Sequence, residues 1–403
     1  MAGFFRNEMH NDFVWAHGYI AFGGPDFGEI RAVAEATGDG GDDAFYAAWV
    51  AAGERMADEA DALLAKGHVT SARETWLRAS VCYGSSFRPL YGSPVDPRLL
   101  LAWRKQRAAF DKGLALGPHP SGPVAIPFGG LSLPGYLIPA QNAESGTRPL
   151  IIFTNGYDGT IVDTYFACAV AASRRGYHSL IFDGPGQGAM LYEGGTSLRP
   201  DWETVIKAVV DFAETLPRVD MSRVALSGWS LGGYLAPRAA SGEKRIAALI
   251  ADPGLWSIAD GFRDLIIRQF GVPAGAAADL GALDDATMAK IDATIRQNPL
   301  LNWKVVRRGF WTHGVDSLRD YFASAELFTM AGRAEAISCP TLITQADGDI
   351  LAAGAGAFHE ALTCPKDLLR FTAAEGAGGH CEMANRSLLN RRVLDWLDER
   401  FGL

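Results

Sequence analysis

The sequence has few cysteines, and none of them are closely spaced. The five are Cys82, Cys168, Cys339, Cys364 and Cys381, an odd number without a C-x-x-C pair. This pattern argues against a disulfide framework and against a zinc ribbon. The four histidines in the first 120 residues also lack metal-ligand spacing: His10, His17, His68 and His119. We therefore expect no metal and no cofactor.

Long hydrophobic runs and an excess of positive charge are also missing. The longest mainly apolar stretch, Tyr165–Ala172, is far below the roughly 18 residues that a membrane-spanning helix needs. The first residues do not join a basic region to an apolar run, as a secretory signal does. With 37 basic and 46 acidic residues, the net charge is −9, and an acidic protein repels phosphate backbones. We expect a cytoplasmic protein that acts on a small molecule and binds neither nucleic acid nor membrane.

Residues 1–118 predict a helical N-terminal domain. The stretch from Asp42 to His68 repeats apolar residues at three- and four-residue steps, and Gly67 ends it. Two more helices are expected, one from about Thr70 and one from about Pro97 to Leu114. The breaker-rich run Gly117–Gly122 closes this region.

After residue 118 the pattern changes to short β-like runs that alternate with helices. Eight runs predict strands: Val124–Phe128, Leu131–Ile138, Leu150–Thr154, His178–Asp183, Arg223–Gly228, Ile246–Asp252, Thr341–Ala346 and Asp367–Thr372. Helical patterns follow most of the later runs: Val162–Arg175, Trp202–Leu216, Ser230–Ala240, Ala353–Leu362 and Ser387–Phe401. Such alternation predicts an α/β protein with a mostly parallel eight-stranded sheet flanked by helices. Gly129 and Gly130 favour an antiparallel hairpin between the first two strands.

Residues 253–337 interrupt this alternation, because their sequence pattern is helical and contains no run that predicts a strand. We expect a helical lid insertion at the carboxyl edge of the sheet, where it would cover a site. The α/β core would then comprise residues 119–252 and 338–403.

The strongest chemical signal is the sequence from Gly228 to Gly233, which reads G-W-S-L-G-G. It follows an apolar strand and opens a helix, the context of a G-x-S-x-G nucleophile elbow. Glycines on both sides of the serine prevent a collision between strand and helix, and the helix N-terminus favours developing negative charge. Ser230 is therefore the predicted nucleophile.

A serine needs a base, and the base needs an orienting acid. In such sheets the acid follows the next-to-last strand and the histidine follows the last. His380 lies in a glycine-rich loop after the last predicted strand and is the predicted base. The acid is Asp349 or Asp347, both directly after the preceding strand. We favour Asp349, with Asp347 as a turn residue.

The oxyanion hole requires two backbone N–H groups. One is expected from Leu231, next to the nucleophile. The other is expected from the turn after Thr154, where Tyr157 is preferred and Gly156 is the alternative. In the same turn, Asp158 or Thr160 is expected to cap the following helix.

Other residues are candidates for the substrate pocket. They are Trp229 beside the nucleophile, Trp311 and His313 in the insertion, and Asp252 at a strand end. Trp311 and His313 fit lid core equally well, and for Asp252 a helix cap or a solvated charge is favoured over a role in the pocket. The run Asp183–Gly188 loosely matches a dinucleotide fingerprint, but Pro185 in its turn argues against a nicotinamide site.

With these residues placed, the chain resembles the α/β-hydrolase superfamily. More closely, it looks like the branch of 2,6-dihydroxypseudooxynicotine hydrolase and of the fungal, yellowish-green type hydrolases that shorten a polyketide chain. The motifs that carry this resemblance are Arg78–Tyr83, Asn155–Gly159, Asp183–Gly188, Trp311–Ser317, Gly379–Met383 and Asn390–Leu397.

The resemblance implies hydrolysis of a carbon–carbon bond next to a ketone, in an aromatic or polyketide-like substrate, through an acyl-enzyme. It also implies a homodimer, and a site covered by the N-terminal helices and the insertion. The same triad breaks C–O and C–N bonds, so an ester, lactone or amide hydrolase or an acyltransferase is the alternative. A receptor without catalysis is a further one, which the complete set of triad residues argues against.

Overall fold

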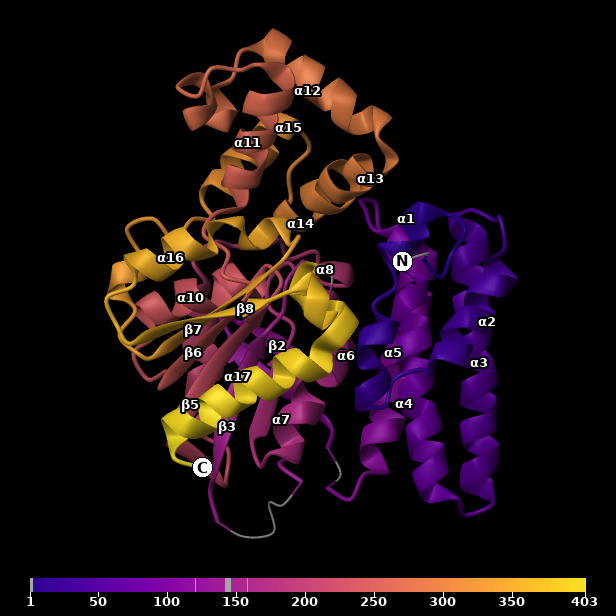
Figure 1. Ribbon diagram of the computed structural model, residues 1–403. Coiled ribbons are helices and arrows are strands. Elements are labelled where there is room, and N and C mark those ends of the chain that lie inside the picture. The colour runs from indigo at the N-terminus through magenta and orange to yellow at the C-terminus, as the bar shows by residue number, and fades with distance from the viewer. Residues whose placement is uncertain (1–2, 120, 142–145, 158) are drawn as a thin grey trace.

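A computed structural model describes residues 3–119, 121–141, 146–157 and 159–403. A sheet lies at the centre, a bundle of N-terminal helices stands beside it, and a helical insertion projects above it (Figure 1). The sheet has eight strands in the order β1-β2-β4-β3-β5-β6-β7-β8. The predicted fold class is confirmed.

The N-terminal region consists of short turns followed by three long helices. Its elements are α1 (Glu8–Asn11), η1 (Ala16–Phe22), α2 (Phe27–Thr37), α3 (Asp42–Ala65), α4 (Val69–Ser86), η2 (Arg88–Leu90) and α5 (Pro97–Ala115). Glycines allow the long helices to approach closely. A methyl group at Gly53 would lie 2.8 Å from the Tyr83 ring, and one at Gly113 would lie 2.7 Å from Leu77.

All eight predicted runs form strands. They are β1 (Pro123–Phe128), β2 (Leu131–Ile138), β3 (Arg148–Thr154), β4 (His178–Phe182), β5 (Val219–Trp229), β6 (Ala248–Asp252), β7 (Thr341–Ala346) and β8 (Lys366–Phe371). β1 and β2 form the expected antiparallel hairpin, β2 pairs antiparallel with β4, and the remaining pairs are parallel. The carboxyl ends of β3, β5, β6, β7 and β8 therefore meet at one edge of the sheet.

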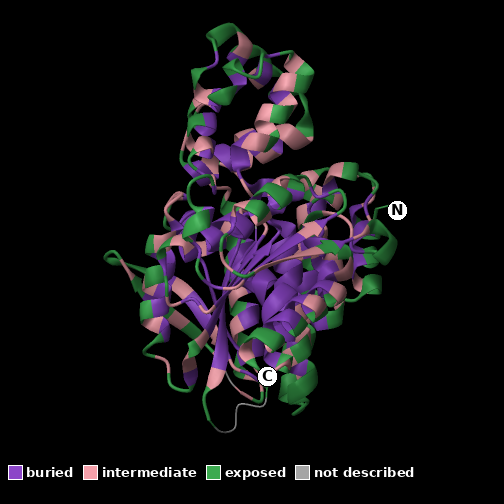
Figure 2. Ribbon diagram, turned by 60° about the vertical axis from the view of Figure 1, so that its left-hand side comes forward, coloured by how far each residue is buried: buried purple, intermediate pink, exposed green. Residues whose placement is uncertain are grey.

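Helices cover both faces of the sheet. They include α6 (Ile161–Thr164), η3 (Tyr165–Ala169), α7 (Val170–Arg174), α8 (Gly188–Tyr192), α9 (Trp202–Ala213), α10 (Gly232–Gly242), η8 (Ile350–Gly354), α16 (Ala355–Ala361), η9 (Ala373–Glu375), η10 (His380–Asn385) and α17 (Arg386–Phe401). Side chains of β3 alternate between two cores. Ile151 packs in a core shared with α17 and the N-terminal helices, and Ile152 packs in a core with α9 and α10. The inner strands β4 and β6 are accordingly buried along their length, whereas the edge strands β1 and β8 are mostly partly exposed (Figure 2).

Residues 253–337 form helices around a small core of their own. The elements are α11 (Ile258–Phe270), η4 (Ala276–Ala278), η5 (Leu280–Ala282), α12 (Asp285–Gln297), α13 (Pro299–Leu301), η6 (Asn302–Gly309), α14 (Phe310–His313), α15 (Leu318–Glu326) and η7 (Ala334–Ala336). Ile266, Ile291 and Phe322 lie in the core of this insertion, which stands above the sheet in Figure 1. Whether the predicted boundaries separate independent domains stays a prediction. In the described ranges, no helix is both long enough and apolar enough to cross a membrane.

Candidate active site

Ser230 occupies a sharp turn between β5 and α10. Its φ is 62°, a left-handed conformation that side-chain-bearing residues rarely adopt. Gly228 and Gly232 make the turn possible, because a methyl group on Gly228 would lie 1.8 Å from the Gly232 carbonyl oxygen. α10 begins at Gly232, two residues later than predicted, and Leu231 is its N-cap. The turn thus holds the serine side chain at the carboxyl edge of the sheet.

The serine is the first member of a hydrogen-bonded chain. Its Oγ lies 2.8 Å from His380 Nε2, and His380 Nδ1 lies 2.9 Å from Asp349 Oδ2. His380 opens η10, in the loop after β8, and Asp349 lies in the loop after β7. The structure brings together the three residues that the sequence predicts as a triad.

The two candidate acids have different surroundings. The Asp349 side chain is 1% exposed, and its carboxylate also accepts hydrogen bonds from the amides of Leu351 at 2.9 Å and Cys381 at 3.4 Å. Burial alone would raise the pKa of Asp349, but the hydrogen bond and charge of His380 and these amides hold it below its ordinary value. Asp349 is therefore an ionised carboxylate that faces the imidazole.

Asp347 instead supports the loop that carries His380. Its carboxylate accepts the Ala373 amide at 3.0 Å, and its carbonyl oxygen accepts the Gly379 amide at 2.7 Å. Of the two aspartates, only Asp349 is placed against the imidazole.

The turn after β3 lies directly against the nucleophile. A methyl group on Gly156 would lie 2.8 Å from the Leu231 backbone nitrogen and 2.9 Å from Ser230 Oγ. The Gly156 amide donates to Asn155 Oδ1 at 2.8 Å, and this bond favours Tyr157 as the second oxyanion donor. Thr160 caps α6, accepting the Asp163 amide as predicted, whereas Asp158 lies outside the described residues.

Gln187 holds this turn from the other side, a role that the sequence did not reveal. Its Nε2 donates to the carbonyl oxygens of Asn155 at 2.7 Å and Gly156 at 3.3 Å, and its Oε1 accepts the Gly184 amide at 2.9 Å. The D-G-P-G-Q-G motif therefore connects β4 to the candidate oxyanion turn. Gln187 sits inside that motif, which is the one signal that could have identified it.

Asp252 lies beneath the elbow, and its carboxylate is engaged there. Its Oδ2 accepts from Arg386 Nη1 at 2.9 Å and its Oδ1 from the Thr344 hydroxyl at 3.0 Å. Arg386, also buried, donates to the Cys381 carbonyl oxygen at 2.9 Å. The structure thus places Asp252 in a buried ion pair and not at the rim of a pocket. This ion pair joins β6 to the loop after β8 that carries His380, called here the histidine loop.

Aromatic residues from distant parts of the chain pack against one another. Trp229 packs edge-on against Trp15, with ring centroids 5.9 Å apart. Trp311 of α14 stacks on Tyr192 at 5.5 Å and lies 5.7 Å from Tyr91 of the N-terminal region. Trp15 was not predicted, because only the fold brings it to the nucleophile elbow.

The loop that carries His380 packs against the N-terminal region, but the His380 side chain is partly exposed to solvent. A methyl group on Gly18 of η1 would lie 2.7 Å from the Met383 carbonyl oxygen, so the N-terminal region supports η10 closely. The His380 side chain is nevertheless 42% exposed, and Ser230 is half-buried. The expected cover over the site is incomplete in this conformation.

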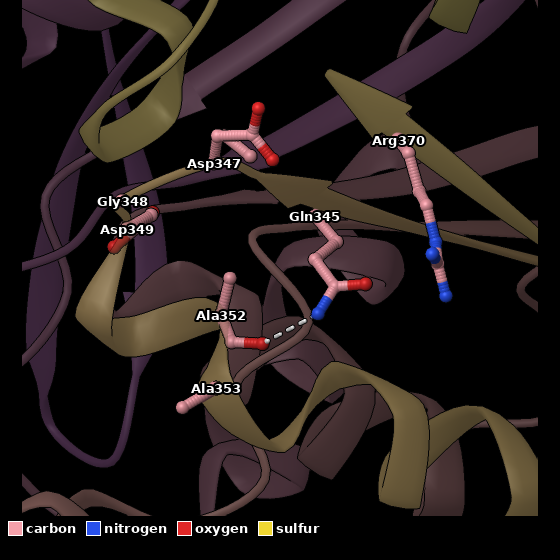
Figure 3. A pocket seen from close by; sticks show the side chains of 8 residues that line it. Gln345, Asp347, Gly348, Asp349, Ala352, Ala353 and Arg370 are labelled. Atoms are coloured by element: carbon pink, nitrogen blue, oxygen red, sulfur yellow. Dashed lines mark hydrogen bonds between the residues drawn. The ribbon is translucent and has the colours of Figure 1, made fainter. Parts of the chain in front are cut away.

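A pocket of about 360 Å³ opens beside Asp349 (Figure 3). Its lining residues come from β7, β8 and the loop after β7: Gln345, Ala346, Asp347, Gly348, Asp349, Ala352, Ala353 and Arg370. Gln345 reaches across it to the Ala352 carbonyl oxygen at 3.5 Å. The pocket therefore borders the acid, on the β7–β8 side of the site.

Within the described ranges, one group of possible metal ligands is close enough to share an ion. It consists of Asp349, His380 and Cys381, whose donor atoms lie within 4.8 Å of one another. The hydrogen bond between Asp349 and His380 accounts for two of the three residues, and Cys381 follows His380 directly and donates its amide to Asp349, so the cluster needs no ion to explain it.

A central sheet with a serine elbow and a facing histidine defines a hydrolase-type protein. A sequence profile of the alpha/beta hydrolase family matches residues 151–387. Hydrolase LUC6 from a Fusarium species is 32% identical over 97% of this chain and 96% of its own length. The 20-hydroxy-prefusarin hydrolase FUS2 from Gibberella moniliformis is 31% identical over 99% of this chain and 98% of its own. The chain belongs to the alpha/beta hydrolase family and is a hydrolase.

A solved structure extends the similarity to the whole fold. That of 2,6-dihydroxy-pseudo-oxynicotine hydrolase covers 94% of each chain with a TM-score of 0.73 at 20% identity. The resemblance inferred from the motifs is thereby confirmed for the fold and the family.

Proposed function

We propose that the protein is a serine-dependent hydrolase that cleaves a carbon–carbon bond adjacent to a ketone through an acyl-enzyme. Its substrate is an aromatic or polyketide-like small molecule, such as a β-diketone. The observation that carries the catalytic part is the hydrogen-bonded chain from Ser230 through His380 to Asp349. The backbone of Leu231 and Gly156 lies beside the Ser230 hydroxyl, which supports an oxyanion hole there.

The first half-reaction forms the acyl-enzyme. His380 Nε2 takes the Ser230 proton as Oγ attacks the ketone carbon, and the amides of Leu231 and Tyr157 bind the resulting oxyanion. Collapse of this intermediate breaks the carbon–carbon bond. The bonding electrons leave on the carbon as an enolate or another stabilised carbanion, and the His380 imidazolium protonates it.

The second half-reaction returns the serine. Water gives a proton to His380 and attacks the acyl carbon, and collapse releases the carboxylic acid while Ser230 regains its proton. Asp349, ionised and buried, fixes the imidazole orientation and stabilises its charged form in both halves. The half-open front of the site gives water direct access to the acyl group.

The choice of bond rests on resemblance. The full-length relatives include a 20-hydroxy-prefusarin hydrolase, and the motifs resemble the branch of 2,6-dihydroxypseudooxynicotine hydrolase. The alternative is an ester, lactone or amide hydrolase or an acyltransferase, which would use the same residues on a C–O or C–N bond.

One pair of substrates separates these functions. An aryl β-diketone and the aryl ester of matching shape are compared by kcat/KM, with product analysis in the presence of added alcohol. A higher value for the diketone, with the free acid as product, supports the carbon–carbon hydrolase. Turnover of the ester alone overturns the assignment of the bond, and an alcohol adduct as the main product indicates an acyltransferase.

A further inference from the structure

The base of the lid is hydrogen-bonded to the candidate oxyanion turn. His313 is the last residue of α14, and its Nε2 lies at hydrogen-bond distance from the Tyr157 hydroxyl. Its Nδ1 lies 2.7 Å from Ser324 Oγ in α15. Two lid helices and the turn after β3 are therefore joined by one chain of hydrogen bonds.

His313 is buried among aromatic rings and carries no charge there. Its ring lies 5.0 Å from Tyr321 and 5.2 Å from Phe328, centroid to centroid. Burial, and after it the positive charge of Arg308, lowers the pKa of His313 to about 3. A neutral imidazole has one donor and one acceptor nitrogen, so it donates one of its two hydrogen bonds and accepts the other in either tautomer.

α14 is also fastened to the core. The Thr312 carbonyl oxygen accepts the Leu198 amide at 2.9 Å, and a methyl group on Gly314 would lie 2.3 Å from Ser197 Oγ. Ser197 and Leu198 follow α8, which begins directly after Gln187. The turn is therefore held twice, by Gln187 at Asn155 and Gly156 and by His313 at Tyr157.

We propose that His313 is a positioning residue that acts through the Tyr157 hydroxyl to set the Tyr157 backbone amide in the oxyanion hole. The base of the lid thereby contributes to transition-state stabilisation and not only to covering the site. The inference rests on the proposed function, since it needs Ser230 to form an oxyanion. An amide displaced from the oxyanion loses much of its effect, because such donors act through preorganised geometry.

The test compares two inhibitors of one shape, an aryl trifluoromethyl ketone and the aryl methyl ketone. The first adds to the serine and forms an oxyanion, and the second reports binding of the ground state. Tyr157→Phe and His313→Phe each remove the hydrogen bond while keeping a ring in place. We expect each to weaken the trifluoromethyl ketone by about tenfold or more, with the methyl ketone changed by less than about twofold. Ser324 lies at the far end of the hydrogen-bond chain. Ser324→Ala is expected to change the ratio of the two inhibition constants in the same direction by a smaller factor.

The matched control is Tyr177→Phe, which removes a hydroxyl bonded to Asp398 at 2.6 Å, away from the site. It should leave both inhibition constants unchanged. An unchanged ratio in Tyr157→Phe and Ser324→Ala, or equal weakening of both inhibitors, overturns the proposal. A wild-type enzyme that the trifluoromethyl ketone neither inhibits nor modifies at Ser230 contradicts the proposed function instead.

Discussion

The backbone amide of Ser230 donates a hydrogen bond of 2.7 Å to the carbonyl oxygen of Asp252. The Asp252 carboxylate is bound in turn by Arg386, which also donates to the Cys381 carbonyl oxygen next to His380. A single buried ion pair therefore touches both the nucleophile turn and the histidine loop. The distance between Ser230 and His380 depends on contacts made beneath them.

Removal of the Arg386 charge should destabilise the fold. Arg386→Met leaves Asp252 buried without its partner, and breaking such a pair costs about 3–5 kcal/mol of unfolding free energy. Urea denaturation measures this loss. The control is Arg392→Met on the same helix, whose ion pair with Glu375 is about one-third exposed and should contribute little to stability. Equal losses in the two variants would argue against a special role for the buried pair.

The two aspartates after β7 are distinguished by matched substitutions. Asp349→Asn removes the charge that orients His380 and is expected to lower kcat by about 10³–10⁴-fold. Asp347→Asn keeps an oxygen that can accept the Ala373 amide, so kcat should change by less than about threefold. Steady-state kinetics of both variants on the same substrate decides between them. The reverse order would make Asp347 the catalytic acid.

The closeness of Gly156 to the nucleophile predicts a steric block. In Gly156→Ala the new methyl group falls against Ser230 Oγ and the Leu231 amide, where the oxyanion would form. We expect kcat/KM to fall by about 100-fold or more. Gly28→Ala is the control, because no atom lies within 4 Å of its new methyl group and kcat/KM should not change. Full activity in Gly156→Ala would mean that the oxyanion forms elsewhere.

Glu382 predicts a pH-dependent stability. It is buried directly after Cys381, and burial, followed by the charge of Asp252, raises its pKa well above the ordinary value of 4.5. Above about pH 4.5 the unfolded chain releases the Glu382 proton, whereas the folded protein keeps it. The stability of the wild type therefore falls as pH rises.

Glu382→Gln removes this proton release and keeps the shape of the side chain. From pH 5 to pH 8 the variant should gain stability relative to the wild type, with a slope of up to about 1.4 kcal/mol per pH unit. Thermal or urea unfolding across this range measures the difference. A difference that is constant with pH would contradict a buried protonated carboxyl.

Much of the fold could be predicted because local patterns report it directly. The apolar runs of β3 and β4 are strands buried on both faces, and the alternation with helices specifies a parallel sheet. The elbow is predictable for the same reason, because Gly228, Ser230 and Gly232 are neighbours in sequence. Asp349 and His380 follow once the strand order is known, since parallel strands end at one edge.

The rest of the site depends on contacts that no local pattern encodes. Trp15 meets Trp229, Arg386 meets Asp252, and His313 meets Tyr157 only after three parts of the chain pack together. Asp252 was expected near a pocket because it ends a strand, but its partner Arg386 lies on α17 and could not be inferred. The partial exposure of the His380 side chain likewise follows from how the parts of the chain pack and not from composition.

Ser230 as the nucleophile is the central assignment, and Ser230→Ala tests it directly. The measurement is kcat/KM on the aryl β-diketone for wild type and variant, with circular dichroism to show that both are folded. We expect a loss of about 10⁴-fold or more with an unchanged spectrum. A folded variant that turns over the diketone at a near-normal rate would contradict the acyl-enzyme mechanism and the assignment of the site.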